Sequence, residues 1–197
     1  MKKRAEEIFH KHGGQLRMSE AIEHGITRYT LYSLRDKGVI EQVSRGIYRL
    51  VELPPINNPD LVTVSLRFPN AVICFISALA YHGITTQIPH YVSVAVPRDS
   101  RMPSLDYPPI QAHRFSNEAY KSGIVEHMID GVPVKIYSPE KTLVDCFKFR
   151  NKIGMDVVLE ALKLYKTRKK FDLDELLKYA RICRVEKIMR PYMEAMV

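Results

Sequence analysis

The chain has 197 residues, of which 46% are hydrophobic and 26% are charged, the usage of an ordinary globular protein. No apolar run reaches the ~20 residues that a bilayer-spanning helix needs, and no apolar stretch follows the basic N-terminus. We therefore expect neither a membrane span nor a secretory signal, and a cytoplasmic protein.

The positive charge is concentrated at the two ends of the sequence. Residues 1–50 hold 10 Lys and Arg against 6 Asp and Glu, and residues 135–197 hold 15 against 9. The middle of the chain, residues 51–134, holds 5 against 7. A net charge of +8 distributed in this way favours an anionic partner such as a nucleic acid, with two regions of contact.

The first elements are expected in the order of a winged helix-turn-helix. A helix over residues 2–12 ends at a glycine pair, and a brief strand over residues 16–18 follows. Ser19 is predicted to cap a second short helix that ends at Gly25. Only two residues then precede a third helix capped by Thr27, and so tight a turn between short helices is typical of a helix-turn-helix.

The third predicted helix has one apolar and one polar face. Leu31 and Leu34 point toward a small core, with Thr27 on the same side. A recognition helix reads DNA bases mainly through its N-terminal half. The candidate base readers are Arg28, Tyr29, Tyr32 and Ser33, with Thr27 beside them among the DNA-binding residues. The candidate phosphate contacts are Arg35, Lys37 and Arg45.

Two strands, residues 39–43 and 47–50, are expected to flank a Ser44-Arg45-Gly46 turn and form the wing. Arg45 at its tip would then lie against the phosphate backbone or in the minor groove. Each of these residues also has a simpler interpretation. The arginines are compatible with a solvated helix face, the tyrosines with packing against the first helix, and Arg45 with an ordinary polar turn.

A break rich in proline and asparagine, residues 53–60, is predicted to link a DNA-binding domain over residues 1–52 to a second domain over residues 61–197. The second domain is expected to be mixed α+β and to end in helices. Its predicted helices cover residues 59–67, 71–82, 117–122, 139–150 and 156–166, followed by a segment capped by Asp172 with Glu175. Its predicted strands cover residues 91–96, 110–115, 124–129 and 132–137, the last two joined by Asp130-Gly131. The fold class is therefore α+β.

Three stretches resemble the AbiEi antitoxin family, in which a winged-helix domain precedes an antitoxin domain. They are GGQLRMSEAIEHGITRYTLYSLRDKGVIEQVSRGIYRL, VICFISALAYHGITTQIPHYVSVAVPR and GVPVKIYSPEKTLVDCFKFRNKIGMDVVLEAL. Together they cover about residues 13–165, and their common order is more specific than any one of them.

The resemblance implies a bacterial antitoxin that represses its own promoter by binding inverted repeats. It also implies a neighbouring nucleotidyltransferase-like toxin, in a phage-resistance system of the abortive-infection class in which antitoxin and toxin need not touch. A basic surface of the antitoxin domain would correspond to the region of Lys141, Lys148, Arg150 and Lys152.

Other functions remain open at this stage. One is a transcriptional regulator without a toxin partner, and another is a toxin-modifying, kinase-like second domain. Asp130, Glu140 and Lys141 loosely resemble the cluster of a metal-dependent nuclease. Glu140 and Lys141 are adjacent on a helix, however, so their side chains should diverge, and Asp130 is explained by its turn. We expect no enzyme activity.

No cofactor or metal site is expected. Cys74, Cys146 and Cys183 are widely spaced and form no ligand motif, which favours buried free thiols. His82 and His113 are single histidines without a nearby nucleophile, and no phosphate-binding glycine loop is visible. The densest basic run, residues 166–170, is as compatible with a solvated loop as with a phosphate contact.

Overall fold

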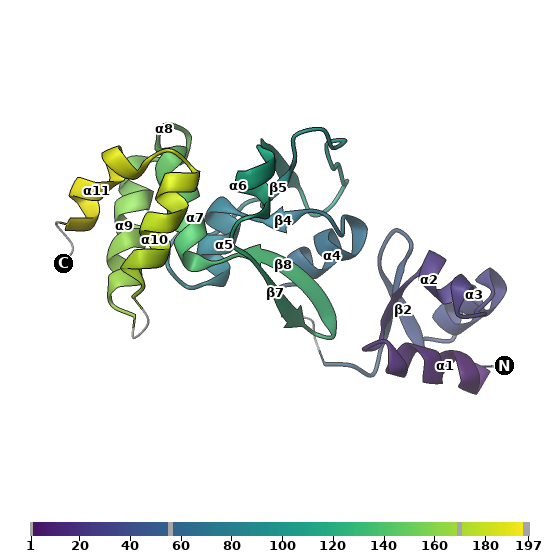
Figure 1. Ribbon diagram of the computed structural model, residues 1–197. Coiled ribbons are helices and arrows are strands. Elements are labelled where there is room, and N and C mark those ends of the chain that lie inside the picture. The colour runs from purple at the N-terminus through teal and green to yellow at the C-terminus, as the bar shows by residue number, and fades with distance from the viewer. Residues whose placement is uncertain (1, 55–56, 169–170, 195–197) are drawn as a thin grey trace. The chain divides into compact units, whose positions relative to one another are not determined.

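The computed structural model describes residues 2–54, 57–168 and 171–194, and its fold is mixed α+β (Figure 1). Its internal contacts divide the chain into two compact units, residues 1–69 with 127–134 and residues 70–126 with 135–197. Helix α4, which the sequence analysis assigned to the second domain, therefore groups with the first unit. The boundaries at residues 52 and 61 stay a prediction.

The first unit opens with three helices and a small sheet. Its elements are α1 Lys2–Lys11, β1 Gln15–Arg17, α2 Met18–Glu23, α3 Arg28–Asp36, β2 Ile40–Ser44, β3 Ile47–Leu50 and α4 Pro59–Arg67. The three strands are antiparallel in the order β1-β3-β2. Helix, strand, two helices and a hairpin follow one another as expected for a winged helix-turn-helix.

One side of each of the helices α1, α2 and α3 is apolar, and these sides pack together with the sheet. The fully buried residues include Phe9 of α1, Leu31 and Leu34 of α3, and Ile40 and Leu50 of the hairpin. The short connection between α2 and α3 is possible because Gly25 adopts φ 84°. Ile26 then returns to the core, and its N–H donates to Ala21 O at 2.8 Å.

The start of α2 differs from the sequence prediction. The helix begins at Met18, one residue before Ser19, and the Ser19 side chain does not cap it. Glu20 Oε2 instead accepts from the Arg17 N–H at 2.9 Å. An acidic side chain in the first turn of a helix can thus accept a hydrogen bond from the N-cap backbone N–H, as in a capping box.

The second unit contains a sheet of five strands in the order β6-β5-β4-β8-β7, except for residues 127–134 around the β7–β8 turn, which group with the first unit. The strands are β4 Val72–Ile73, β5 Val92–Pro97, β6 Ile110–Phe115, β7 Ile124–Ile129 and β8 Val132–Tyr137. The helices are α5 Phe75–Tyr81, α6 Asn117–Lys121, α7 Pro139–Lys148, α8 Arg150–Ile153, α9 Met155–Lys166, α10 Leu173–Ile182 and α11 Glu186–Glu194. Helix α7 contacts α5, α9 and α10 and is the central helix of the unit (Figure 1).

The apolar run over residues 71–82 was predicted to be one helix, which is wrong for its first part. Val72 and Ile73 form the short central strand β4, and Ile73 pairs with both Val94 and Ile136. The chain then turns sharply at Phe75, whose φ is 48°, and only from there is it helical. The helix predicted over residues 139–150 likewise ends at Lys148, and Arg150 starts α8.

Candidate nucleic-acid interface

Helix α3 presents the polar face expected of a recognition helix. Leu31 and Leu34 are completely buried, whereas Tyr29 and Tyr32 are 82% and 41% exposed. Arg28 is exposed at the first helical position. Burial of the leucines fixes the rotation of the helix, so the two tyrosine rings face outward one turn apart. Ser33 is only half-buried and lies at the edge of this face.

Thr27 acts as the N-cap of α3, as predicted. Its hydroxyl accepts from the Thr30 N–H at 3.2 Å and lies 2.9 Å from the Thr30 hydroxyl. The side chain is exposed and not on the core side, because capping requires an extended backbone that turns it outward. The hydroxyl is therefore already engaged within the helix.

Arg35 is less available than a free surface arginine. Its Nη2 lies 2.8 Å from Asp36 Oδ1, and its guanidinium carbon is 5.2 Å from the centroid of the Tyr32 ring. Asp36 raises the pKa of Arg35 through this hydrogen bond. Lys37, directly after the helix, is exposed. The C-terminal half of α3 thus carries a positive charge that is partly neutralised by Asp36.

The wing places Arg45 at an exposed turn between β2 and β3. A bulge between Gln42 and Ser44 shifts the register there, and Gly46 adopts φ 76°. The turn is fixed to α2, because the Met18 N–H donates to Gly46 O at 2.8 Å. Arg45 therefore projects from a turn whose backbone is held in place.

Arg17 is a basic residue that the sequence analysis missed. Arg17 lines a pocket beside the wing turn, together with Arg28 and Gly46. A single arginine in a three-residue strand shows no periodic pattern, so only the folded arrangement brings it next to the start of α3.

The basic residues proposed for the second unit differ in exposure. Lys148 and Lys152 are exposed, and Lys152 contributes with burial to a lowered pKa of His113. Arg150 is half-buried, donates to Phe147 O at 3.2 Å and lies over the Phe147 ring. Its guanidinium is thus already engaged at the end of α7.

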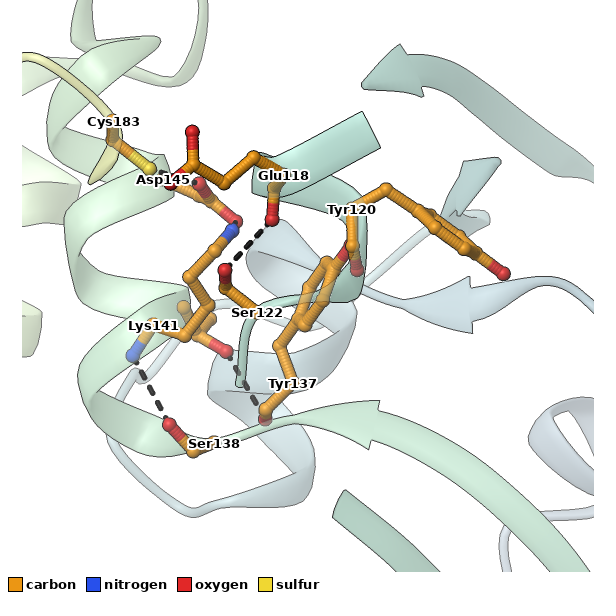
Figure 2. A network of polar contacts seen from close by, with 9 residues as sticks. Glu118, Tyr120, Ser122, Tyr137, Ser138, Lys141, Asp145 and Cys183 are labelled. Atoms are coloured by element: carbon orange, nitrogen blue, oxygen red, sulfur yellow. Dashed lines mark hydrogen bonds and ion pairs between the residues drawn. The ribbon is translucent and has the colours of Figure 1, made fainter. Parts of the chain in front are cut away.

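Lys141, which the resemblance placed in this basic surface, is instead buried and pairs with Asp145 (Figure 2). Figure 2 also shows Cys183, whose Sγ donates to Asp145 Oδ1 at 3.4 Å. Position 141 is on the inner face of α7, which packs into the core, so the expected surface role is wrong.

Each of the nuclease-like residues is engaged by other residues of its own unit. Lys141 is enclosed in the core, and Glu140 accepts from the Tyr165 hydroxyl at 2.5 Å. Asp130 occupies the hairpin turn with φ 48° and accepts from the Asn57 N–H at 2.7 Å. In the described part of the chain, no three His, Cys, Asp or Glu side chains gather as metal ligands would.

The three cysteines are free and buried, as predicted. Burial raises the pKa values of Cys74 and Cys146 well above the usual thiol range. Neither thiol is suited to act as a nucleophile, because the reactive form is the thiolate.

Comparison with known protein families supports the winged helix-turn-helix interpretation of the first unit. Residues 3–51 match the family of the AbiEi antitoxin, a transcriptional regulator. The resemblance inferred from the sequence is thereby confirmed over this AbiEi-type segment, which contains α1 to β3 and every candidate DNA-binding residue of the first unit. Beyond residue 51 the resemblance stays a prediction.

A solved structure resembles a larger part of the chain. The RV2827C protein from Mycobacterium tuberculosis shares the fold with a TM-score of 0.54 and 15% identity, over 91% of this chain and 71% of that chain. No curated protein matches the sequence. Among the described residues, every helix is too short or too polar to span a membrane.

Proposed function

We propose that the protein is a DNA-binding autorepressor and antitoxin of an AbiE-type toxin–antitoxin operon. It binds inverted repeats in its own promoter and counters a nucleotidyltransferase-like toxin encoded beside it. The observation that carries the proposal is the exposed face of α3, with Tyr29 and Tyr32 outward, within a segment that matches a family of transcriptional regulators.

Base recognition is assigned to the tyrosine pair, and backbone contact to the wing. An exposed aromatic ring on a recognition helix offers an apolar face to thymine methyl groups and a hydroxyl to base edges. Arg45 on the wing turn contributes a charge contact to phosphate, which holds the protein on DNA of any sequence. The exposed Lys148 and Lys152 of the second unit add further phosphate contacts.

A gel-shift titration of the full chain on its own upstream DNA tests this function, with excess nonspecific competitor at near-physiological salt. We expect specific retardation that weakens steeply as salt rises. Tyr29→Ala should lower the preference for the operator, whereas Arg45→Ala should weaken binding to both DNAs alike. Tyr107→Ala is the matched control, because Tyr107 is 71% exposed in the second unit. No preference over competitor would refute operator binding.

The antitoxin role requires a separate assay. Co-expression with the neighbouring toxin should restore growth, and an Arg45→Ala/Tyr29→Ala variant should still rescue if neutralisation does not depend on promoter binding. Operator binding without any rescue would instead support a transcriptional regulator that has no toxin partner.

A further inference from the structure

A pocket of about 570 Å³ lies beside the wing turn of the first unit. Its walls come from α2, from the first residue of α3, from Gly46 in the wing turn and from the end of α4. The pocket therefore touches the two elements to which DNA binding is assigned, and neither Tyr29 nor Tyr32 is among its lining residues.

The charge of this pocket is positive. Arg17, Arg28 and Arg67 all line it, against a single acidic residue, Glu23. Arg17 has spare hydrogen-bonding capacity, because its buried Nε has no hydrogen-bond partner among the residues that the structure describes. That Nε forms an ion pair with Glu20 Oε1 at 3.8 Å, a separation too great for a hydrogen bond.

Three arginines that line one pocket match an anion with several acceptor oxygens. A phosphate group accepts paired hydrogen bonds from the planar fork of an arginine and is the usual partner of arginine clusters. The polar Ser19 hydroxyl at the rim supplies a further donor. The chemistry of the pocket therefore favours a phosphate over a neutral ligand.

We propose that this pocket binds a phosphodiester of the DNA backbone, and that Arg17 and Arg28 grip that phosphate instead of reading a base. The inference rests on the proposed function and revises the sequence-based role of Arg28. Base reading is then left to Tyr29 and Tyr32, whose rings face away from the protein. Phosphate contacts set the position of a protein on the duplex, and base contacts set the sequence.

Salt dependence separates these two roles. The affinity of the full chain for operator and for competitor DNA is measured at several salt concentrations, for wild type, Arg17→Ala and Arg28→Ala. Each variant should reduce the slope of log affinity against log salt by about 0.9. The ratio of operator to competitor affinity should stay unchanged. Arg4→Ala, an exposed arginine of α1 outside the pocket, should leave the slope as it is.

Arg17→Lys controls for misfolding of the variant. It keeps the positive charge and the backbone N–H from which Glu20 accepts a hydrogen bond. The slope of log affinity against log salt should be close to wild type in Arg17→Lys and reduced in Arg17→Ala. A fall in the operator-to-competitor ratio in Arg28→Ala would make Arg28 a base reader and overturn the assignment. Unchanged slopes in both alanine variants would overturn the phosphate site while leaving operator binding intact.

A free anion is the other source of the same chemistry. Inorganic phosphate is therefore added to the protein at constant ionic strength, and the melting temperature is followed. Stabilisation of wild type but not of Arg17→Ala, with DNA slopes unchanged, would show a site for free phosphate and refute the assignment to DNA. Lack of any operator preference in wild type would refute the proposed function itself.

Discussion

Lys141 and Asp145 form an ion pair one turn apart on α7, and both side chains are buried, with exposures of 0% and 1%. The lysine ammonium lies 4.3 Å from the centroid of the Tyr137 ring and 5.1 Å from that of Phe115. Burial raises the pKa of Asp145, and the charge of Lys141 opposes that rise. Both charged groups are thus buried in the core of the second unit, and two aromatic rings lie against the lysine.

Removing one member of this pair should be far more damaging than removing both. Lys141→Ala leaves the Asp145 carboxylate buried without its partner and should cost about 3–5 kcal/mol of unfolding free energy. Replacing the pair together, by Lys141→Met and Asp145→Leu, removes both buried charges and should cost much less. Urea denaturation of the full chain measures the difference. A Lys141→Ala variant within about 1 kcal/mol of wild type would contradict this prediction.

Gly123 allows the backbone to approach the same lysine closely. Its φ is 73°, and an added Cβ would lie only 2.6 Å from the Cβ of Lys141. Gly123→Ala should therefore destabilise the second unit by more than the ~1 kcal/mol that a positive φ alone costs an alanine.

Gly83 provides the control for this substitution, because it shares the positive φ and lies in open surroundings. Among the described residues, an added Cβ there would meet the Arg168 guanidinium alone, at 3.7 Å. Denaturation of Gly83→Ala measures the backbone effect by itself. An equal loss of unfolding free energy in Gly123→Ala and Gly83→Ala would show that the contact with Lys141 does not affect stability.

Cys183 should make the protein sensitive to alkaline pH. Burial raises the pKa of its thiol to about 12, from an ordinary value of 9.0. Between these two values the unfolded chain loses the thiol proton while the folded chain retains it, so stability falls as pH rises above about 9. The slope approaches about 1.4 kcal/mol per pH unit for one group.

The comparison of wild type with Cys183→Ala isolates this contribution from other groups that titrate at high pH. The stability difference between the two proteins should narrow from pH 8 to pH 10.5 in chemical denaturation. A stability difference that stays constant from pH 8 to pH 10.5 would show that the Cys183 thiol titrates alike in the folded and unfolded states. Thiol reagents at pH 8 should modify none of the three buried cysteines before unfolding.

Thr27 should matter for the helix more than for the DNA. Thr27→Ala removes the acceptor of the Thr30 N–H and should cost about 1 kcal/mol, typical of a lost N-cap. Amide exchange in α3 should then quicken roughly fivefold, which hydrogen exchange can measure. Thr27→Ser keeps the cap and should restore both protection and operator affinity. Loss of operator affinity in Thr27→Ser would instead indicate direct contact with DNA.

Local sequence signals predicted the elements that depend on local chemistry. Asp130-Gly131 adopts positive φ at both residues and closes the β7–β8 hairpin at the expected positions. Ser138 caps α7 by accepting from the Lys141 N–H, and Asp172 caps α10 by accepting from the Glu175 N–H. These interactions span three residues, so the sequence contains all the information they need.

The errors arose where distant residues decide the outcome. Val72 and Ile73 are strand residues only because β5 and β8 lie on either side, and a short apolar run does not distinguish a buried strand from a buried helix. Lys141 was assigned to a basic surface through the family resemblance, which does not show which side of its helix is buried. Its burial depends on the Tyr137 and Phe115 rings, which come from two strands of the sheet.

Because Arg35 is paired with Asp36, the positive charge of α3 is unevenly distributed along the helix. Arg28 and Arg17 line one pocket at its amino end, where the helix dipole adds positive potential, whereas Asp36 offsets the charge of Arg35 near the other end. In the proposed complex the duplex is therefore attracted to the amino end of α3, and α3 enters the groove with that end first. A tip of one and a half turns is about 8 Å long, the rise of two to three base pairs. Each copy of the protein then reads only about two to three base pairs through α3. A selective operator must therefore contain this half-site more than once, in accord with the proposed inverted repeats.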